Sequence, residues 1–80
     1  MEHTVEQIMA DVLKISKTDI TDKLTIDDLE TWDSLKHMDL IVSLEQAFNT
    51  EFTFDEIIIM TSVISIKRIL NNKGMLETWN

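Results

Sequence analysis

The hydrophobic positions of this chain recur at the spacing of α-helices. Apolar residues three and four apart predict helices at about 4–15, 34–49 and 61–73, and a short additional helix at about 55–60. The intervening residues 16–32 form a long connection rich in Asp and Thr, and a short turn is predicted inside it near Thr25 to Leu29. The pattern predicts an all-α, four-helix bundle with a short third helix and a long loop between the first and second helices.

The segment 57–60, Ile-Ile-Ile-Met, is ambiguous when it is taken alone. Its β-branched residues are typical of strands. No second strand-like segment is present to pair with it, so we interpret it as a single buried or half-buried helical turn. The chain enters this turn through Phe52 and Phe54.

The first and last predicted helices each carry one apolar face, and we expect these faces to form much of the core. Residues at helical spacing mark both faces. They are Val5, Ile8, Met9, Val12 and Leu13 in the first helix, and Val63, Ile66, Ile69 and Leu70 in the last.

Capping residues are present at the ends of these helices. Thr4 and Gln7 have the spacing of a capping box, and Gly74 is suited to the position just beyond the last helix. The cations Lys67, Arg68 and Lys73 lie toward the end of that helix, where positive charge complements the dipole. Residues 75–80 are predicted to be a C-terminal tail that contains Trp79.

The second helix differs from the others because it has apolar residues on two sides. One stripe consists of Leu40, Ile41, Leu44 and Phe48, with His37 beside it. The other consists of Leu35, Met38 and Val42, flanked by Asp39 and Glu45. A helix in a small domain buries one stripe against its own core, so we expect the second stripe to face a partner. The helix start is marked by Asp33, a preferred N-cap residue, followed by Ser34.

Length and charge limit the classes of function. Eighty residues predict one domain, residues 1–80, and a net charge of −8 disfavours binding to nucleic acid or anionic membranes. No Lys or Arg lies between His37 and Ile66, whereas five acidic residues do, which favours basic partners. The chain has no cysteine, no apolar run long enough for a bilayer and no visible signal peptide, so we expect a cytoplasmic location. We also expect the chain to be a monomer.

The long loop contains two features that suggest a site. Asp19, Asp22, Asp27 and Asp28 are clustered, but an EF-hand loop needs a central glycine and the loop has none, so we predict no metal site. Trp32 can be interpreted in two ways. In the interpretation that we favour, its ring pins the loop onto the bundle. In the other, it contacts a prosthetic arm or a partner.

Ser34 could be an ordinary helix-start serine or a nucleophile. A nucleophile needs a general base held by an orienting group. The nearest imidazole, His37, groups with the core stripe and not with Ser34, and no glycine-bearing oxyanion loop is present. A hydrolase is therefore disfavoured, and His37 is also disfavoured as a metal ligand because His3 is the one other imidazole in the sequence.

The segment around Ser34 resembles the acyl carrier proteins. Asp33-Ser34-Leu35 followed by Met-Asp-Leu-Ile-Val-Ser-Leu-Glu-Gln-Ala-Phe at 38–48 is similar to their Asp-Ser-Leu signature at the start of a long acidic helix. The resemblance continues without a gap through 51–56 and 60–63 into the last helix, so it covers most of the chain. It implies an all-α bundle of acyl-carrier type.

The resemblance also implies a cofactor, partners and a site. In that family the serine is joined through a phosphodiester to 4′-phosphopantetheine, taken from coenzyme A by a phosphopantetheinyl transferase, and cargo is carried as a thioester. Carried over to this chain, Ser34 is the attachment point and Asp33 and Leu35 complete the motif. An acyl-loading ligase or acyltransferase and downstream synthases would be further partners. The positions that would meet these enzymes are Met38, Asp39, Val42 and Glu45.

Two departures from the family pattern concern the pathway. Lys36 and His37 stand where many fatty-acid carriers have an acidic and a small polar residue, and Ile58 and Ile59 replace common charged residues. The form Trp-Asp-Ser-Leu-x-His is similar to free-standing carriers of specialised acyl or polyketide-type pathways. Peptidyl carriers usually have glycines before the serine, and this chain has none, so an aminoacyl or peptidyl carrier is a distant alternative.

We therefore expect a carrier that is not itself an enzyme and that serves fatty-acid, polyketide or related acyl-transfer pathways. The alternative from another class is an unmodified acidic helical adaptor that binds proteins through Leu35, Met38 and Val42.

Overall fold

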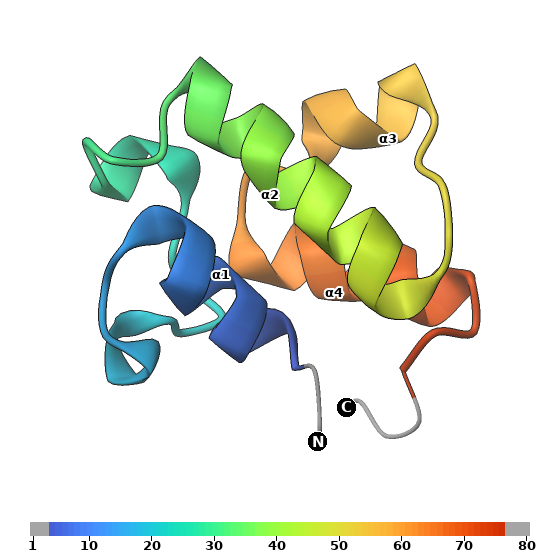
Figure 1. Ribbon diagram of the computed structural model, residues 1–80, viewed down its shortest axis with the longest axis horizontal. Helices are drawn as coiled ribbons and strands as arrows, with labels where there is room; N and C mark the ends of the chain where they lie inside the picture. Colours follow the sequence, from blue (N-terminus) through green and yellow to red (C-terminus); the bar gives the residue numbers. More distant parts are fainter. Residues whose placement is uncertain (1–3, 77–80) are drawn as a thin grey trace.

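The computed structural model describes residues 4–76, and within that range the chain forms four α-helices and two 3-10 helices (Figure 1). In Figure 1, α2 crosses the front of the molecule, with α1 beside it, α3 above and α4 behind. No strand forms in the described part, where an isolated bridge pairs Thr25 with Ser62. The predicted all-α bundle is confirmed. Its elements in chain order are α1 Val5–Leu13, η1 Lys17–Asp19, η2 Ile26–Asp28, α2 Ser34–Phe48, α3 Phe54–Ile59 and α4 Val63–Asn72.

The start of α1 has only half of the predicted capping box. The Gln7 amide donates to Thr4 Oγ1 at 3.1 Å, but the Gln7 side chain donates to Asp11 at 3.0 Å and does not return to Thr4. The helix ends at Leu13, two residues before the predicted end at Ile15. Lys14 adopts a left-handed conformation with φ 61°, which lets the Ile15 N–H bond the Ala10 carbonyl at 3.2 Å. This turn brings Ile15 back against the core.

The core confirms most of the predicted apolar faces. All the buried residues of the described range are apolar, and they come from every α-helix except α3 and from the connections. Val12 and Phe48 were predicted as core and are half-buried at its edge, whereas Ala10 is buried and was not predicted. The buried residues are Val5, Ile8, Met9, Ala10, Leu13, Ile20, Trp32, Leu40, Ile41, Leu44, Phe52, Met60, Val63, Ile66, Ile69 and Leu70.

The long connection is tied to the junction before α4 by backbone hydrogen bonds. The Ile26 N–H donates to the Thr61 carbonyl at 2.8 Å, and the Val63 N–H donates to the Leu24 carbonyl at 3.0 Å. The predicted turn near Thr25 to Leu29 is confirmed as η2. It is closed by a capping box in which an Asp28 carboxylate oxygen accepts the Thr25 N–H at 2.9 Å. The loop therefore has a defined path to the start of α2.

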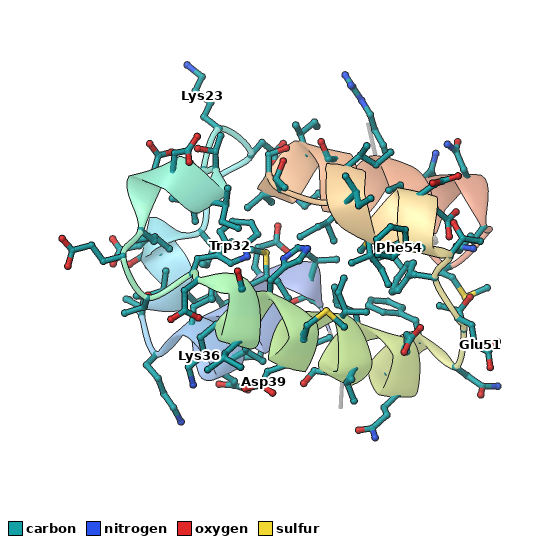
Figure 2. The ribbon with its side chains drawn as sticks, turned by 90° about the horizontal axis from the view of Figure 1, so that it is seen from above. Lys23, Trp32, Lys36, Asp39, Glu51 and Phe54 are labelled. Carbon is teal, nitrogen blue, oxygen red and sulfur yellow. The ribbon has the colours of Figure 1, made fainter. Side chains whose placement is uncertain are left out.

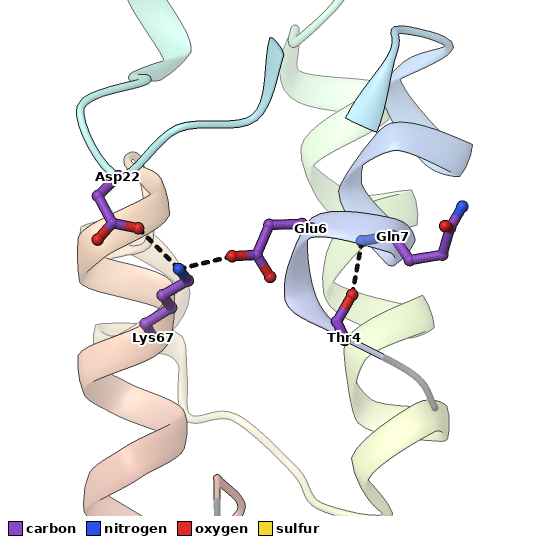
Figure 3. A network of polar contacts seen from close by, with 5 residues as sticks. All are labelled: Thr4, Glu6, Gln7, Asp22 and Lys67. Carbon is purple, nitrogen blue, oxygen red and sulfur yellow. Dashed lines mark hydrogen bonds and ion pairs between the residues drawn. The ribbon is translucent and has the colours of Figure 1, made fainter. Parts of the chain in front are cut away.

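Lys67 joins three segments that are distant in sequence (Figure 3). Its Nζ lies 2.7 Å from a carboxylate oxygen of Glu6 in α1 and 2.7 Å from one of Asp22 in the loop. Burial opposes the charge on Lys67, but the hydrogen bonds to Asp22 and Glu6 outweigh it and raise the pKa of this amine. Burial of Glu6 is likewise outweighed by the bond from Lys67, so the pKa of Glu6 is lowered.

The predicted role of the α4 cations in complementing the helix dipole is not observed. The last turn of α4 contains no basic residue, because Lys67 and Arg68 precede it and Lys73 is the C-cap. Lys67 contacts the carboxylates of Glu6 and Asp22. The Lys73 amine instead lies 3.1 Å from Glu56 at the start of α3. Gly74 follows with φ 75°, the left-handed geometry predicted for it.

The predicted tail begins as part of the bundle. Met75 donates its N–H to the Leu70 carbonyl at 2.9 Å, and Met75 and Leu76 pack against the core. Residues 77–80, with Trp79, lie outside the described residues, and so does His3.

The short helix α3 is confirmed, but its predicted burial is wrong at two positions. Ile57 is half-buried, whereas Ile58 and Ile59 are 55% and 58% exposed. Phe54 is 75% exposed although Phe52, just before the helix, is buried. A helix of six residues can turn only one side toward the core, and Ile57 occupies that side.

Candidate functional site

Ser34 is the first residue of α2, and its neighbour Asp33 caps the helix. The Asp33 carboxylate accepts the Lys36 N–H at 2.9 Å, and the Asp33 carbonyl accepts the His37 N–H at 2.8 Å, which confirms the predicted cap. The amides of Ser34 and Leu35 have no acceptor among residues 4–76. Ser34 is exposed, so its hydroxyl lies in solvent next to two free N–H groups.

This arrangement fits a negatively charged group attached to Ser34. The free amides at a helix start point out of the helix, and the macrodipole adds positive potential there. Because α2 has 15 residues, the dipole of several turns contributes at this end. The Asp33 carboxylate is held on the Lys36 amide and leaves the Ser34 and Leu35 amides open.

His37 lies one turn after Ser34, and both of its ring nitrogens are engaged elsewhere. Nδ1 lies 3.0 Å from the indole Nε1 of Trp32, and Nε2 lies 3.0 Å from the Ile57 carbonyl oxygen. An imidazole held in this way has no free nitrogen with which to take a proton from Ser34. The geometry therefore gives no support to a Ser–His nucleophile.

Trp32 pins the loop, as favoured from the sequence. Its side chain is only 2% exposed, and Figure 2 shows it directed inward beside the start of α2. Its indole N–H bond to His37 adds a link that sequence reasoning missed. The long loop is thereby fixed immediately before Asp33.

The outward stripe of α2 is confirmed as a surface. Leu35, Met38 and Val42 are 79%, 49% and 47% exposed, while Leu40, Ile41 and Leu44 of the opposite stripe are buried. Asp39 is also exposed and lies on the side of α2 away from α3, together with Lys36 (Figure 2). There Asp39 and Val42 line an open groove between α1 and α2, together with Lys14, Lys36 and others.

Glu45, which was predicted to flank the same stripe, uses its carboxylate in a hydrogen bond to the backbone. It is half-buried, and its Oε2 accepts the Phe52 N–H at 2.9 Å. This bond fixes the segment between α2 and α3. Asp39 and Glu45 are therefore not equivalent, because one is a surface charge and the other holds the backbone.

The exposed face of α3 is the feature of this surface that sequence reasoning missed. In the described part of the chain, every large hydrophobic side chain that is exposed belongs to α2 or α3. The sequence signal was the presence of more apolar residues in a single helical turn than one side of it can bury. The set is Leu35, Met38, Val42, Phe54, Ile58 and Ile59, and we call it the apolar surface.

No group of three or more potential metal-ligand side chains is found within residues 4–76, and Asp22 and Asp28 of the acidic loop are engaged with Lys67 and Thr25. Among residues 4–76, none of the helices combines the length and the apolar composition that a bilayer span requires.

Comparison with known proteins gives a direct assignment. The family model of the phosphopantetheine attachment site matches residues 3–70, which is most of the chain and includes Ser34 with all of α1, α2 and α3. No curated protein matches the chain. Members of this family carry a covalently attached 4′-phosphopantetheine group, and the exposed serine beside free helix amides fits such a phosphate ester. The chain therefore belongs to the phosphopantetheine attachment site family and is a carrier protein of the acyl-carrier type.

Proposed function

We propose that Ser34 is the attachment residue and that the chain carries acyl groups to partner enzymes without being an enzyme itself. The observation that carries the proposal is the exposed Ser34 hydroxyl beside the free amides of Ser34 and Leu35. The 4′-phosphopantetheine arm supplies, when bound, a terminal thiol on which an acyl group is carried as a thioester. The chain has no cysteine, so none of its own side chains could supply such a thiol.

The residues of the chain would have separate tasks. Asp33 orients the first turn of α2, and the amides of Ser34 and Leu35 receive the negative charge of a phosphate ester. A phosphopantetheinyl transferase with coenzyme A as donor would esterify Ser34. Residues 1–80 would act as one carrier domain and as a monomer.

The other serines differ from Ser34 in ways that support this choice. Ser62 caps α4 and bonds Ser65, Ser16 bonds Thr18, and Ser43 is half-buried in the middle of α2. None of them stands at the start of a helix behind an Asp cap. We therefore expect modification at Ser34 alone.

The apolar surface indicates what kind of partner the carrier meets. The segments that carry it also expose the acidic residues Asp39 in α2, Glu51 before α3 and Asp55 in α3, and no Lys or Arg occurs between His37 and Ile66. A partner that is apolar at its centre and basic at its rim would fit this surface. The departures of Lys36, His37, Ile58 and Ile59 from the pattern of fatty-acid carriers favour a specialised acyl or polyketide-type pathway over the housekeeping one.

The test is incubation with coenzyme A, Mg²⁺ and a promiscuous phosphopantetheinyl transferase, followed by intact-mass measurement and peptide mapping. We expect the mass of one phosphopantetheine arm on Ser34, none in Ser34→Ala, and normal modification in Ser16→Ala, another exposed serine. Ser34→Ala should keep the helical circular dichroism of the wild type. An unmodified wild-type chain would favour the alternative, an acidic adaptor that uses the same apolar surface unmodified.

A further inference from the structure

A chain of two hydrogen bonds joins the long loop, α2 and α3 through one imidazole. Trp32 contributes its indole N–H from the loop, His37 stands in the first turns of α2, and the Ile57 carbonyl belongs to α3. The indole and imidazole ring centroids are 6.1 Å apart.

The partners determine where the proton of His37 resides. An indole nitrogen can only donate, so the His37 Nδ1 that lies 3.0 Å from it must be unprotonated and accept. A carbonyl oxygen can only accept, so the Nε2 that lies 3.0 Å from the Ile57 oxygen must carry the proton. The ring is therefore neutral in the Nε2–H form when both bonds are made.

The helix that receives this bond depends on tertiary contacts. A helix of six residues is too short to be stable alone in water. Two side chains of α2 bond the backbone of the α3 segment at its two ends. Glu45 accepts the Phe52 N–H at the entrance, and His37 donates to the Ile57 carbonyl near the exit.

The position of α3 determines the shape of the apolar surface, because Phe54, Ile58 and Ile59 project from it and Leu35, Met38 and Val42 project from α2. Of the two α2 side chains that bond the α3 segment, His37 is nearer in sequence to Ser34 than Glu45 is. His37 lies one helical turn after the serine whose hydroxyl a transferase must reach. Trp32 sits on the other side of Ser34 in sequence and holds the same imidazole.

We propose that His37 is a positioning residue, which in its Nε2–H form fixes α3 and the Trp32 loop relative to Ser34 so that α2 and α3 present one docking surface to the modifying enzyme. The part of this proposal that concerns docking rests on the proposed carrier function. The part that concerns the position of α3 does not.

The first measurement uses the unmodified wild-type chain labelled with ¹⁵N. A scalar coupling across the hydrogen bond between Trp32 Nε1 and His37 Nδ1 is expected, together with imidazole nitrogen shifts that place the proton on Nε2. A proton on Nδ1 would overturn the proposal, because that ring could not accept from the indole.

The second measurement uses two substitutions that separate the bonds. In His37→Gln the side-chain amide nitrogen reaches about as far as the histidine Nε2, so it can still donate to the Ile57 carbonyl. In His37→Asn the side-chain amide oxygen lies near the position of Nδ1, so it can accept from Trp32 but the side chain cannot reach Ile57. We expect α3 amides to exchange with solvent about two- to tenfold faster in His37→Asn, the effect of losing one hydrogen bond, and much less so in His37→Gln. Exchange in α4 should be unchanged in both.

Trp32→Phe is the matched control for the other bond, because it removes the indole N–H and retains an aromatic ring. It should leave the Nε2 bond to Ile57 in place and change the amide hydrogen exchange of α3 less than His37→Asn does. If His37→Gln and His37→Asn behaved alike, whether both like the wild type or both equally loosened, the imidazole would act by packing alone and the proposal would be wrong. The wild-type coupling remains decisive if a variant fails to fold.

The proposed role of His37 in docking is tested by the kinetics of the transferase reaction. His37→Asn should raise the KM for the carrier, with a smaller change in kcat, and His37→Gln should restore it toward the wild type. Faster α3 exchange with an unchanged KM would refute the docking role. A wild-type chain that is never modified would refute the carrier function instead, and the exchange data would still stand.

Discussion

The two faces of α2 have the same kinds of side chain and opposite surroundings. Leu40 and Leu44 are fully buried and Ile41 is nearly so, whereas Leu35 on the same helix is 79% exposed. Burial of a large aliphatic side chain stabilises a protein by about 1.5–3 kcal/mol. The outer face of α2, formed by Leu35, Met38 and Val42, does not gain this stabilisation in the isolated chain. Because a small domain has little stability to spare, an apolar face left in water indicates a role in binding.

The largest effect that tests this difference is the truncation of an inner side chain. Leu44→Ala should lower the free energy of unfolding by about 2–5 kcal/mol, because it opens a cavity in the core. Val42→Ala, which removes methyl groups from the outer face two residues earlier, should cost far less and weaken partner binding instead. Phe48→Ala should cost less than Leu44→Ala, since Phe48 is only half-buried.

Urea denaturation of the three variants measures these differences. If Val42→Ala proved as destabilising as Leu44→Ala, the outer face would be part of the folded core and its assignment as a docking surface would fail.

The second test compares Glu45 with Asp39, the two acidic residues that flank the outer face. Glu45→Ala should destabilise the protein by about 1–3 kcal/mol, because it leaves the Phe52 N–H without its charged acceptor. Asp39→Ala should change stability by no more than about 0.5 kcal/mol, as is usual for an exposed side chain. Equal costs in thermal or urea unfolding would contradict the different roles that the structure gives them.

Acid provides a third test, because carboxylates away from the outer face contribute to folding. The Thr53 backbone N–H is the main cause that lowers the pKa of Glu56, with Lys73 adding to it, and Lys67 lowers the pKa of Glu6 against the effect of burial. Folded-state values below the ordinary 4.5 mean that the unfolded chain binds more protons. The stability from these groups is complete above that value and is lost as the pH falls through the folded-state pKa.

A pH series of urea unfolding curves should therefore show stability falling in acid below the ordinary Glu value of 4.5. Glu6→Gln combined with Glu56→Gln should be less stable at neutral pH and should lose less on acidification. A double variant whose stability fell as steeply as that of the wild type would show that other carboxylates dominate.

The smallest expected effect is kinetic and belongs to the outer face alone. Asp39→Lys should slow pantetheinylation by a transferase with a basic docking surface at low salt, because exposed charges steer association over a Debye length of about 10 Å at 0.1 M. The difference from the wild type should shrink as salt is added. An unchanged rate at low salt would leave the docking surface dependent on its apolar residues. Glu45→Lys is unsuitable here, since it would also break the bond to Phe52.

Helical periodicity was enough to predict both faces of α2 and the core face of α4, and residue preferences were enough to predict the cap at Asp33 and the role of Gly74. Each of these features depends on residues close in sequence. The sequence could not reveal the partners of Lys67 and His37, which lie in other elements: Lys67 bonds Asp22 and Glu6, and His37 bonds Ile57. The burial of α3 was mispredicted for a related reason. Periodicity shows which residues share a side of a helix, but for a helix of one or two turns it does not show which side meets the core.

The pairing of the loop with the start of α4 bears on the order in which the chain folds. Residues 24–26 and 61–63 bond each other although all of α2 and α3 lies between them in the sequence. Helices form from local contacts on fast timescales, whereas this pairing must first close a long segment of chain against its entropy. We expect the helices to form early and the loop to dock late. A newly made chain would then present a properly oriented Ser34 only after its most distant backbone contacts had closed.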